Sequence, residues 1–302
     1  MRTVFLGTSD FAVAVLERLA AGEHRPQLVV TRPDSPRGRG RRLAPPPAAE
    51  AARRLGIDLI QPASVNDEKA RERIAAAAPD VVAIASYGGL IKEPLLSDYE
   101  MLNVHPSLLP RWRGAAPIER AIMAGDEATG VTIMRPTAEL DAGPIALQAP
   151  EPVAPDDDYG SLSARLAELG GELLVRALDS PLALEDQPLE GVTYADKIEP
   201  ADRWLDPARP AAELERRVRA LTPHVGAYLE LPDGERLGVR RAAAATGGGL
   251  APGEVSAREG RLLYGAADGP LELYEVQPAG KRPMDASSYL RGHAVQPTGQ
   301  RE

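Results

Sequence analysis

The sequence predicts an α/β protein, with a Rossmann-like, doubly wound parallel sheet followed by a second, smaller β-barrel domain of OB-like type. Two observations lead to this fold class. In the first two-thirds of the 302 residues, short apolar runs alternate with helical patterns, as they do in parallel sheets. In the last third, five short strand-like runs follow one another, separated by Gly, Pro and Asp. We therefore predict a first domain at 1–188, a linker at 189–206 and a second domain at 207–302.

Each element follows from its own pattern. The run at 81–85 is β-branched and apolar on both faces, as expected of a central strand. The helix at 117–124 has proline in its first turn and Gly125 just past its end. The other predicted strands lie at 3–6, 28–30, 58–60, 101–105, 129–134, 227–231, 237–240, 253–255, 261–264 and 271–276, and the other helices at 11–19, 48–55, 67–78, 162–178 and 211–221. The proline- and acid-rich stretch at 181–201 has little periodicity, which is typical of a linker.

Composition excludes several classes of function. The chain has no cysteine, which removes disulfides, thiolate zinc sites and a cysteine nucleophile. No second histidine lies at ligand spacing, so we expect no metal. The turn after the first strand has a single glycine, Gly7, so a dinucleotide fingerprint is absent. Without a leader or an apolar run near ~20 residues, we expect a cytoplasmic protein that does not enter a membrane. We also expect it to be a monomer.

One basic loop lies within an acidic part of the chain. The net charge of the protein is −9, yet residues 31–42 hold five arginines and one aspartate. Their glycines and prolines argue against a regular element, so we expect an exposed loop. Two interpretations are open: a solvated surface loop, or an arm that contacts phosphates and becomes ordered on its partner.

Polar side chains gather near the end of the strand predicted at 101–105. Asn103 and His105 are two residues apart, so their side chains point to the same face of that strand. Asp141 lies in a turn after the next predicted strand. Acyl or formyl transfer to an amine would use three such groups. The amide donates to the oxyanion, the imidazole relays a proton, and the carboxylate pairs with the imidazole. Each residue also has a structural interpretation, as a strand histidine, a turn-forming asparagine or a β-turn aspartate.

The stretch at 103–118, Asn-Val-His-Pro-Ser-Leu-Leu-Pro-Arg-Trp-Arg-Gly-Ala-Ala-Pro-Ile, closely resembles the hallmark of the folate-dependent formyltransferases. The opening at 5–12, the basic loop and the segments at 130–134 and 140–143 also resemble that family. The stretch at 277–284, Gln-Pro-Ala-Gly-Lys-Arg-Pro-Met, resembles its C-terminal signature. The resemblance covers essentially the whole chain. It implies the formyltransferase fold for the first domain and a tRNA-binding role for the second.

The resemblance further implies that a formyl group moves from 10-formyltetrahydrofolate, as co-substrate, to the α-amine of methionine on initiator tRNA. Three groups of residues take roles in it: for catalysis Asn103, His105 and Asp141; for folate Tyr87, Gly88, Leu90, Ser107, Leu108, Leu109 and Pro110; for tRNA Arg37, Arg39, Arg41, Arg42, Lys281 and Arg282. The alternatives are a formyltransferase acting on an amino sugar or nucleotide, a hydrolase that releases formate from the folate, and a non-catalytic RNA-binding protein. The basic loop and the C-terminal signature together favour tRNA.

Overall fold

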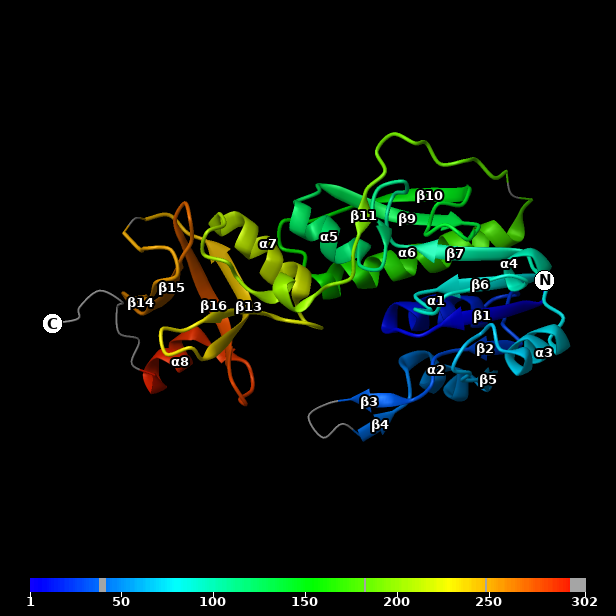
Figure 1. The fold of residues 1–302 in the computed structure, drawn as a ribbon, viewed down its shortest axis with the longest axis horizontal. Coiled ribbons are helices and arrows are strands. Elements are labelled where there is room, and N and C mark those ends of the chain that lie inside the picture. The colour runs from blue at the N-terminus through cyan, green and yellow to red at the C-terminus, as the bar shows by residue number, and fades with distance from the viewer. Residues whose placement is uncertain (38–41, 182, 248, 294–302) are drawn as a thin grey trace. The chain divides into compact units, whose positions relative to one another are not determined.

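The computed structural model describes residues 1–37, 42–181, 183–247 and 249–293 of the chain (Figure 1). The chain forms two compact units. The first unit consists of residues 1–117, 128–152 and 163–196. The second unit takes in 118–127 and 153–162, and then the chain from 197 onward. The chain thus enters the second unit twice before its final entry, which falls inside the linker predicted at 189–206.

A seven-stranded sheet forms the centre of the first unit. Its order is β10-β9-β7-β6-β1-β2-β5. The strands are β1 (Thr3–Gly7), β2 (Leu28–Val30), β5 (Asp58–Ile60), β6 (Val81–Ala85), β7 (Met101–His105), β9 (Ala128–Met134) and β10 (Ile145–Pro152). From β5 to β7 every pairing is parallel, whereas β9 is antiparallel to both β7 and β10. The predicted α/β sheet is therefore parallel at its core, with two antiparallel strands added at one edge.

The antiparallel edge has a simple cause in the connections. A parallel return needs a crossover that packs over the sheet. The helix between β7 and β9, α5 (Pro117–Ala124), belongs almost wholly to the second unit. The connection from β9 to β10 is a turn of ten residues, 135–144, with no helix in it. The chain therefore reverses direction at both places.

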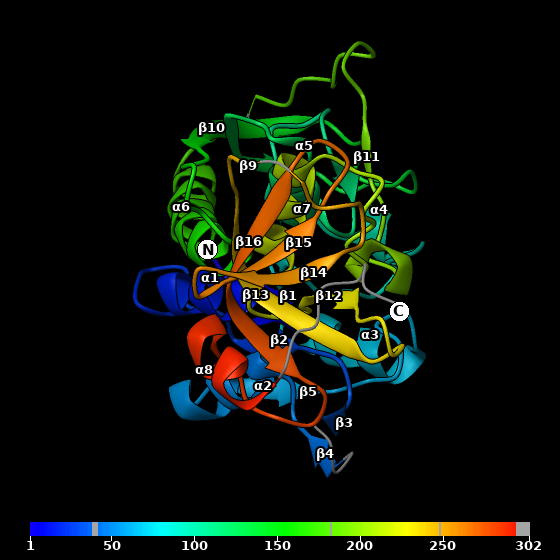
Figure 2. The ribbon, with the colours of Figure 1, turned by 90° about the vertical axis from the view of Figure 1, so that its left-hand side faces the viewer.

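Helices cover both faces of this sheet (Figure 2). On one face lie α1 (Asp10–Ala20), α2 (Pro47–Leu55) and α6 (Tyr159–Asp179), and on the other α3 (Glu68–Ala76) and α4 (Leu95–Asp98). The α3 and α4 side buries one alternate set of strand residues, with Val4 of β1 and Val82 of β6 packed in a cluster with Ile74 and Leu95. None of the helices in the described ranges has the length and apolar character to cross a membrane.

The strand order places a topological switch between β1 and β6. The chain moves outward from β1 to β2 and β5, and then returns to β6 and moves the other way to β7. At such a switch the loops after the two central strands diverge, and ligands bind in the crevice beyond their carboxyl ends. The two loops are joined here by one hydrogen bond, from Thr8 Oγ1 to the carbonyl of Tyr87 at 2.7 Å.

The second unit contains an antiparallel sheet of six strands. Its order is β12-β13-β16-β15-β14, with β17 paired to β16. The elements are the 3₁₀ helix η1 (Pro200–Arg203), α7 (Ala211–Leu221), β12 (Ala227–Glu230), β13 (Arg236–Ala244), β14 (Val255–Arg258), β15 (Arg261–Gly265), β16 (Pro270–Pro278), β17 (Met284–Asp285) and α8 (Ala286–Gly292). Leu214 and Val218 of α7 are buried against Leu229, Val239 and Leu271 of the sheet. Among the described residues β12 and β14 remain as edges, so the coarser prediction of a β-domain is confirmed and barrel closure stays a prediction.

The basic loop is more regular than predicted. β3 (Ser35–Arg37) and β4 (Arg42–Ala44) pair as an antiparallel ribbon, with Arg37 opposite Arg42. The expectation that Gly and Pro exclude a regular element here is wrong. Each strand of a two-stranded ribbon has one side without a partner strand. The nitrogen of Pro36, which has no hydrogen to donate, can face that side without loss of a hydrogen bond between the strands. Arg39 and Arg41 lie outside the described residues.

Candidate active site

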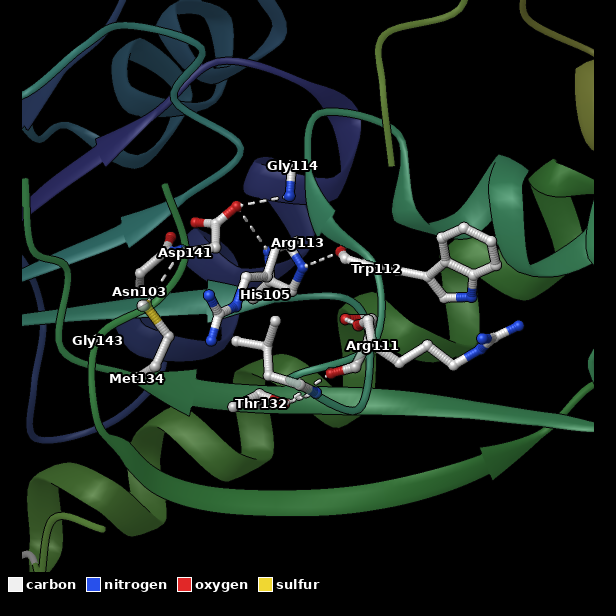
Figure 3. A network of polar contacts seen from close by, with 12 residues as sticks. Asn103, His105, Arg111, Trp112, Arg113, Gly114, Thr132, Met134, Asp141 and Gly143 are labelled. Carbon is white, nitrogen blue, oxygen red and sulfur yellow. Dashed lines mark hydrogen bonds and ion pairs between the residues drawn. The ribbon is translucent and has the colours of Figure 1, made fainter. Parts of the chain in front are cut away.

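The structure brings together the three predicted catalytic residues (Figure 3). Asn103 and His105 lie on β7, and their side chains share the face of the sheet that α4 covers, together with Met101. Asp141 lies in the turn between β9 and β10, and Figure 3 shows its carboxylate beside both. The site therefore forms at the carboxyl end of β7, near the switch of the sheet.

The ring of His105 is held in one orientation. Its Nε2 donates to the carbonyl oxygen of Trp112 at 2.8 Å, and a carbonyl can only accept, so Nε2 carries a proton. In the neutral ring Nδ1 then has the free lone pair. That nitrogen faces Asp141 Oδ2 at 3.7 Å, and His105 is only 4% exposed. Any second proton on the ring must therefore reside at Nδ1, next to the carboxylate.

Asp141 is fixed by its backbone as well as by its side chain. Its Oδ2 accepts a hydrogen bond from the backbone N–H of Gly114 at 2.9 Å. Its φ of +45° lies in the left-handed region, which aspartate tolerates better than most residues. Gly114 has φ +120°, and a Cβ there would lie 2.8 Å from the carbonyl oxygen of Ala195. A glycine is thus required for the N–H at 114 to reach the carboxylate.

Asn103 retains a donor for a stronger partner. Its Nδ2 lies 3.8 Å from the sulfur of Met134, which is a weak acceptor. The side chain is partly buried, so an oxyanion beside it would be shielded from bulk water. The arrangement offers an amide donor and an imidazole whose free nitrogen faces a carboxylate, which suits proton transfer coupled to charge on an oxygen.

The loop that contributes Trp112 and Gly114 is held by the predicted linker. β8 (Arg113–Gly114) pairs in parallel with β11 (Tyr194–Ala195). The N–H of Trp112 donates to Thr193 Oγ1 at 2.9 Å, and the N–H groups of residues 115 and 116 donate to the carbonyl of Ala195. Residues 193–195 thus hold the backbone of this loop in place, and we call them the strap. The sequence did not predict this role, because the stretch has little periodicity.

Two further residues, Gln187 and Arg113, belong to the site and were not predicted from the sequence. The buried Gln187 side chain binds both Arg113 and the turn that carries Asp141. Arg113 falls within the hallmark stretch at 103–118. That stretch indicated the region of the site, but it did not indicate the role of Arg113. Gln187 stands in a proline- and acid-rich segment, where no pattern distinguishes it.

The first set of predicted folate residues follows β6. Tyr87 is buried, and burial raises the pKa of its phenol. Gly88 is exposed with φ +70°, and its carbonyl accepts a hydrogen bond from Arg32 Nη1 at 2.6 Å. Leu90 is 68% exposed, while its carbonyl accepts from Asn66 Nδ2 at 2.8 Å. Hydrogen bonds therefore hold the backbone of this segment in place, and the apolar side chain of Leu90 is exposed to solvent.

The second set of predicted folate residues, at 107–110, divides into two kinds. Ser107 is fully buried, and its Oγ donates to the carbonyl of Arg111 at 2.6 Å. The buried Leu109 donates its N–H to Thr132 Oγ1 at 3.1 Å. These two residues shape the loop from inside. Leu108 and Pro110 are partly exposed and are the members of the set that a ligand could touch.

The predicted tRNA-binding residues lie in both units. Arg37 and Arg42 stand at the described ends of the β3–β4 ribbon in the first unit. Lys281 and Arg282 are exposed in the turn between β16 and β17 of the second unit. The carbonyl of Lys281 accepts from Gln277 Nε2 at 3.0 Å, which fixes this turn.

Comparison with known proteins decides the family. The model of the formyl transferase family matches residues 1–178. The chain belongs to the formyl transferase family. In this formyl transferase family member, residues 197–294 also match the model of the formyl transferase C-terminal domain. It is 45% identical over 303 residues to the methionyl-tRNA formyltransferase of Halorhodospira halophila, covering 98% of this chain and 97% of that one. It is 42% identical to the enzyme of the same name from Ruegeria pomeroyi, over 100% of both chains.

Solved structures share the fold of this formyl transferase family member. HypX from Aquifex aeolicus, in complex with tetrahydrofolic acid, superimposes with a TM-score of 0.67 at 20% identity, over 96% of this chain and 47% of that one. WlaRD, a sugar 3N-formyl transferase, gives a TM-score of 0.66 at 14% identity, over 93% and 99% of the two chains. These likenesses concern the fold, and they confirm the formyltransferase fold that was predicted for the first domain.

Within the described part of this formyl transferase family member, no group of three or more His, Asp and Glu side chains could hold a metal ion. That a metal has no part in the reaction stays a prediction.

Proposed function

We propose that this chain transfers the formyl group of 10-formyltetrahydrofolate to the amine of methionine on initiator methionyl-tRNA. The observation that carries the proposal is the convergence of Asn103, His105 and Asp141 at the carboxyl end of β7. The identity of 45% to a methionyl-tRNA formyltransferase, over nearly all of both chains, supports the choice of substrate.

The loop after β6 suits a flat, partly apolar co-substrate. The exposed side chain of Leu90 offers a face for such a ring. A Cβ at Gly88 would have no atom within 4 Å, so there is open space beside it. We infer that Tyr87, Gly88 and Leu90 hold the ring, with Leu108 and Pro110 on the neighbouring loop. Ser107 and Leu109 would support that loop without touching the ligand.

The residues at the site match the needs of formyl transfer. 10-Formyltetrahydrofolate supplies an activated formyl carbon. The amine nitrogen of methionine bonds to that carbon, the bond from the carbon to the folate nitrogen breaks, and one proton passes from the amine to the folate nitrogen. Asn103 Nδ2 donates to the formyl oxygen as negative charge develops on it. His105 takes or gives the moving proton at Nδ1, and Asp141 stabilises the ring when it is charged.

The second unit and the β3–β4 ribbon are proposed to bind tRNA. Lys281, Arg282 and Arg42 are exposed cations that can neutralise phosphates. The OB-like barrel is also part of the proposal. The register shifts between 239 and 242 on β13 support it, since bulges bend strands as a barrel requires. We further infer a cytoplasmic monomer that works without a metal.

The direct test is a transfer assay with radiolabelled 10-formyltetrahydrofolate. We expect label on methionyl initiator tRNA and at least tenfold less on methionyl elongator tRNA. Label on a nucleotide-linked amino sugar at a higher rate than on tRNA would replace the proposal with the amino-sugar alternative. Formate released at the same rate with and without tRNA would replace it with the hydrolase.

A further inference from the structure

The side chain of Gln187 uses its whole hydrogen-bonding capacity within the first unit. A glutamine amide has two N–H donors and two acceptor lone pairs on its oxygen. Nε2 donates to the carbonyls of Asp141 and Gly143, each at 2.8 Å. Oε1 accepts from Nε and Nη2 of Arg113 at 3.0 and 2.8 Å. Gln187 is 8% exposed, so water cannot readily replace these bonds.

The partners leave no ambiguity about how the amide is oriented. The guanidinium of Arg113 can only donate, and the two backbone carbonyls can only accept. A flipped amide would face donors with its N–H groups and acceptors with its oxygen, so all four bonds would be lost. The two ends of this one side chain therefore hold two different segments.

Those two segments are the ones that fix the catalytic pair. Gly143 and Asp141 belong to the turn between β9 and β10. Arg113 lies between Trp112, whose carbonyl holds the ring of His105, and Gly114, whose N–H holds the carboxylate. Gln187 thus joins the backbone under Asp141 to the loop that orients both members of the pair.

We propose that Gln187 is a positioning residue that sets the separation of His105 and Asp141, an inference that rests on the proposed function. Asp141 adopts a left-handed backbone, which residues other than glycine adopt rarely and which surrounding contacts must maintain. The 3.7 Å between Nδ1 and Oδ2 is longer than a hydrogen bond, so the pair does not hold itself together. Its geometry depends on the backbone on each side. Gln187 joins the two segments through four hydrogen bonds of a buried side chain, whereas the Glu139 carboxylate that also reaches Arg113 is 74% exposed.

The test uses two variants of the full chain. Gln187→Ala removes all four bonds, while Gln187→Glu keeps oxygen acceptors for Arg113 and places an oxygen against two carbonyls in place of the donors. We expect kcat for formyl transfer to fall by about 10- to 100-fold in both, with KM for folate and for tRNA within about threefold of the unchanged protein. A role in general stability alone would instead lower the thermal unfolding temperature of both variants and leave kcat of the folded protein within threefold of the unchanged protein.

Hydrogen–deuterium exchange gives a readout that needs no substrate. In Gln187→Glu the amides of 139–143 should exchange faster, while those of β1 and β6 stay unchanged. Gln277→Ala is the matched control, because Gln277 Oε1 also accepts two bonds from one arginine, Arg240, but in the second unit. It should leave exchange at 139–143 unchanged.

The outcomes separate this inference from the proposed function. A kcat for Gln187→Glu within threefold of the unchanged protein overturns the positioning role, and so does unchanged exchange at 139–143. An unchanged protein that transfers no formyl group to methionyl-tRNA overturns the proposed function, and the exchange data then still decide whether Gln187 holds the turn.

Discussion

Replacement of Asp141 by asparagine isolates the charge of the proposed catalytic pair. In Asp141→Asn the amide oxygen can still accept the hydrogen bond that Gly114 gives to Oδ2, so the turn should keep its shape. The negative charge 3.7 Å from His105 Nδ1 is lost. For two unit charges at this separation, an effective dielectric constant of about 20 gives an interaction of about 4 kcal/mol.

That energy sets the expected loss of activity. The Asp141 side chain is 18% exposed, and partial screening by water reduces the effect to about 2–4 kcal/mol. At 1.36 kcal/mol per factor of ten, kcat should fall by roughly 30- to 1,000-fold. The measurement is steady-state formyl transfer at saturating folate and tRNA, with thermal unfolding to verify that the variant is folded.

The same turn offers a control with a similar ion pair. Glu139 Oε1 lies 3.7 Å from Arg113 Nη1, but the Glu139 side chain is 74% exposed. Exposed ion pairs contribute little, so Glu139→Gln should lower kcat by less than about threefold. A kcat for Asp141→Asn within fivefold of the unchanged protein would refute a catalytic role for the Asp141 charge, and so would an equal loss of kcat in Glu139→Gln.

Three further predictions concern a donor, a cation and an ion pair. Asn103→Ala should lower kcat by about 10²–10³-fold with little change in KM, as loss of an oxyanion donor does, and a change confined to KM would contradict this role. Arg42→Ala should raise KM for tRNA but not for folate and reduce the salt dependence of tRNA binding by about one unit of slope, whereas equal effects on both KM values would exclude a phosphate contact. Burial opposes the charge of Asp202, but the hydrogen bonds from Arg120, at 2.9 and 3.0 Å, prevail and lower the pKa of this carboxyl from 3.8. Asp202→Asn should therefore cost about 1.5–3 kcal/mol of unfolding free energy at pH 7. The difference in unfolding free energy between the two proteins, measured by urea titration, should shrink as the pH falls below 3.8 and should be lost below the lowered pKa of Asp202 in the folded state. A difference that persists at that pH would refute the ion-pair explanation.

The parts of the fold that local patterns specify were predictable. The strands at 81–85 and 101–105 and the helices at 117–124 and 211–221 occupy the predicted residues. In these segments apolar residues recur at the spacing of the element, and the ends carry proline or glycine. The shared face of Asn103 and His105 follows from strand alternation alone.

The parts that depend on distant segments were not predictable. The direction of β9 depends on where α5 packs, which its sequence does not reveal. The ribbon formed by β3 and β4 depends on pairing across residues whose composition indicates a loop. Gln187 lies 74 residues from Arg113 and 46 from Asp141, so no spacing rule connects them. A buried amide with four partners is visible only once the chain has folded.

The hallmark stretch also acts in a way that its residue types do not reveal. His105 is oriented by the carbonyl of Trp112, and Asp141 by the N–H of Gly114, so two peptide groups do part of the positioning. Trp112 has φ +63°, and the hydrogen bond from its N–H to Thr193 helps to maintain this left-handed backbone. Side-chain chemistry therefore explains why an asparagine and a histidine stand at 103 and 105. The residues from 112 to 114 matter because their backbone, held by the strap at 193–195 and by Gln187, presents one acceptor and one donor to the catalytic pair.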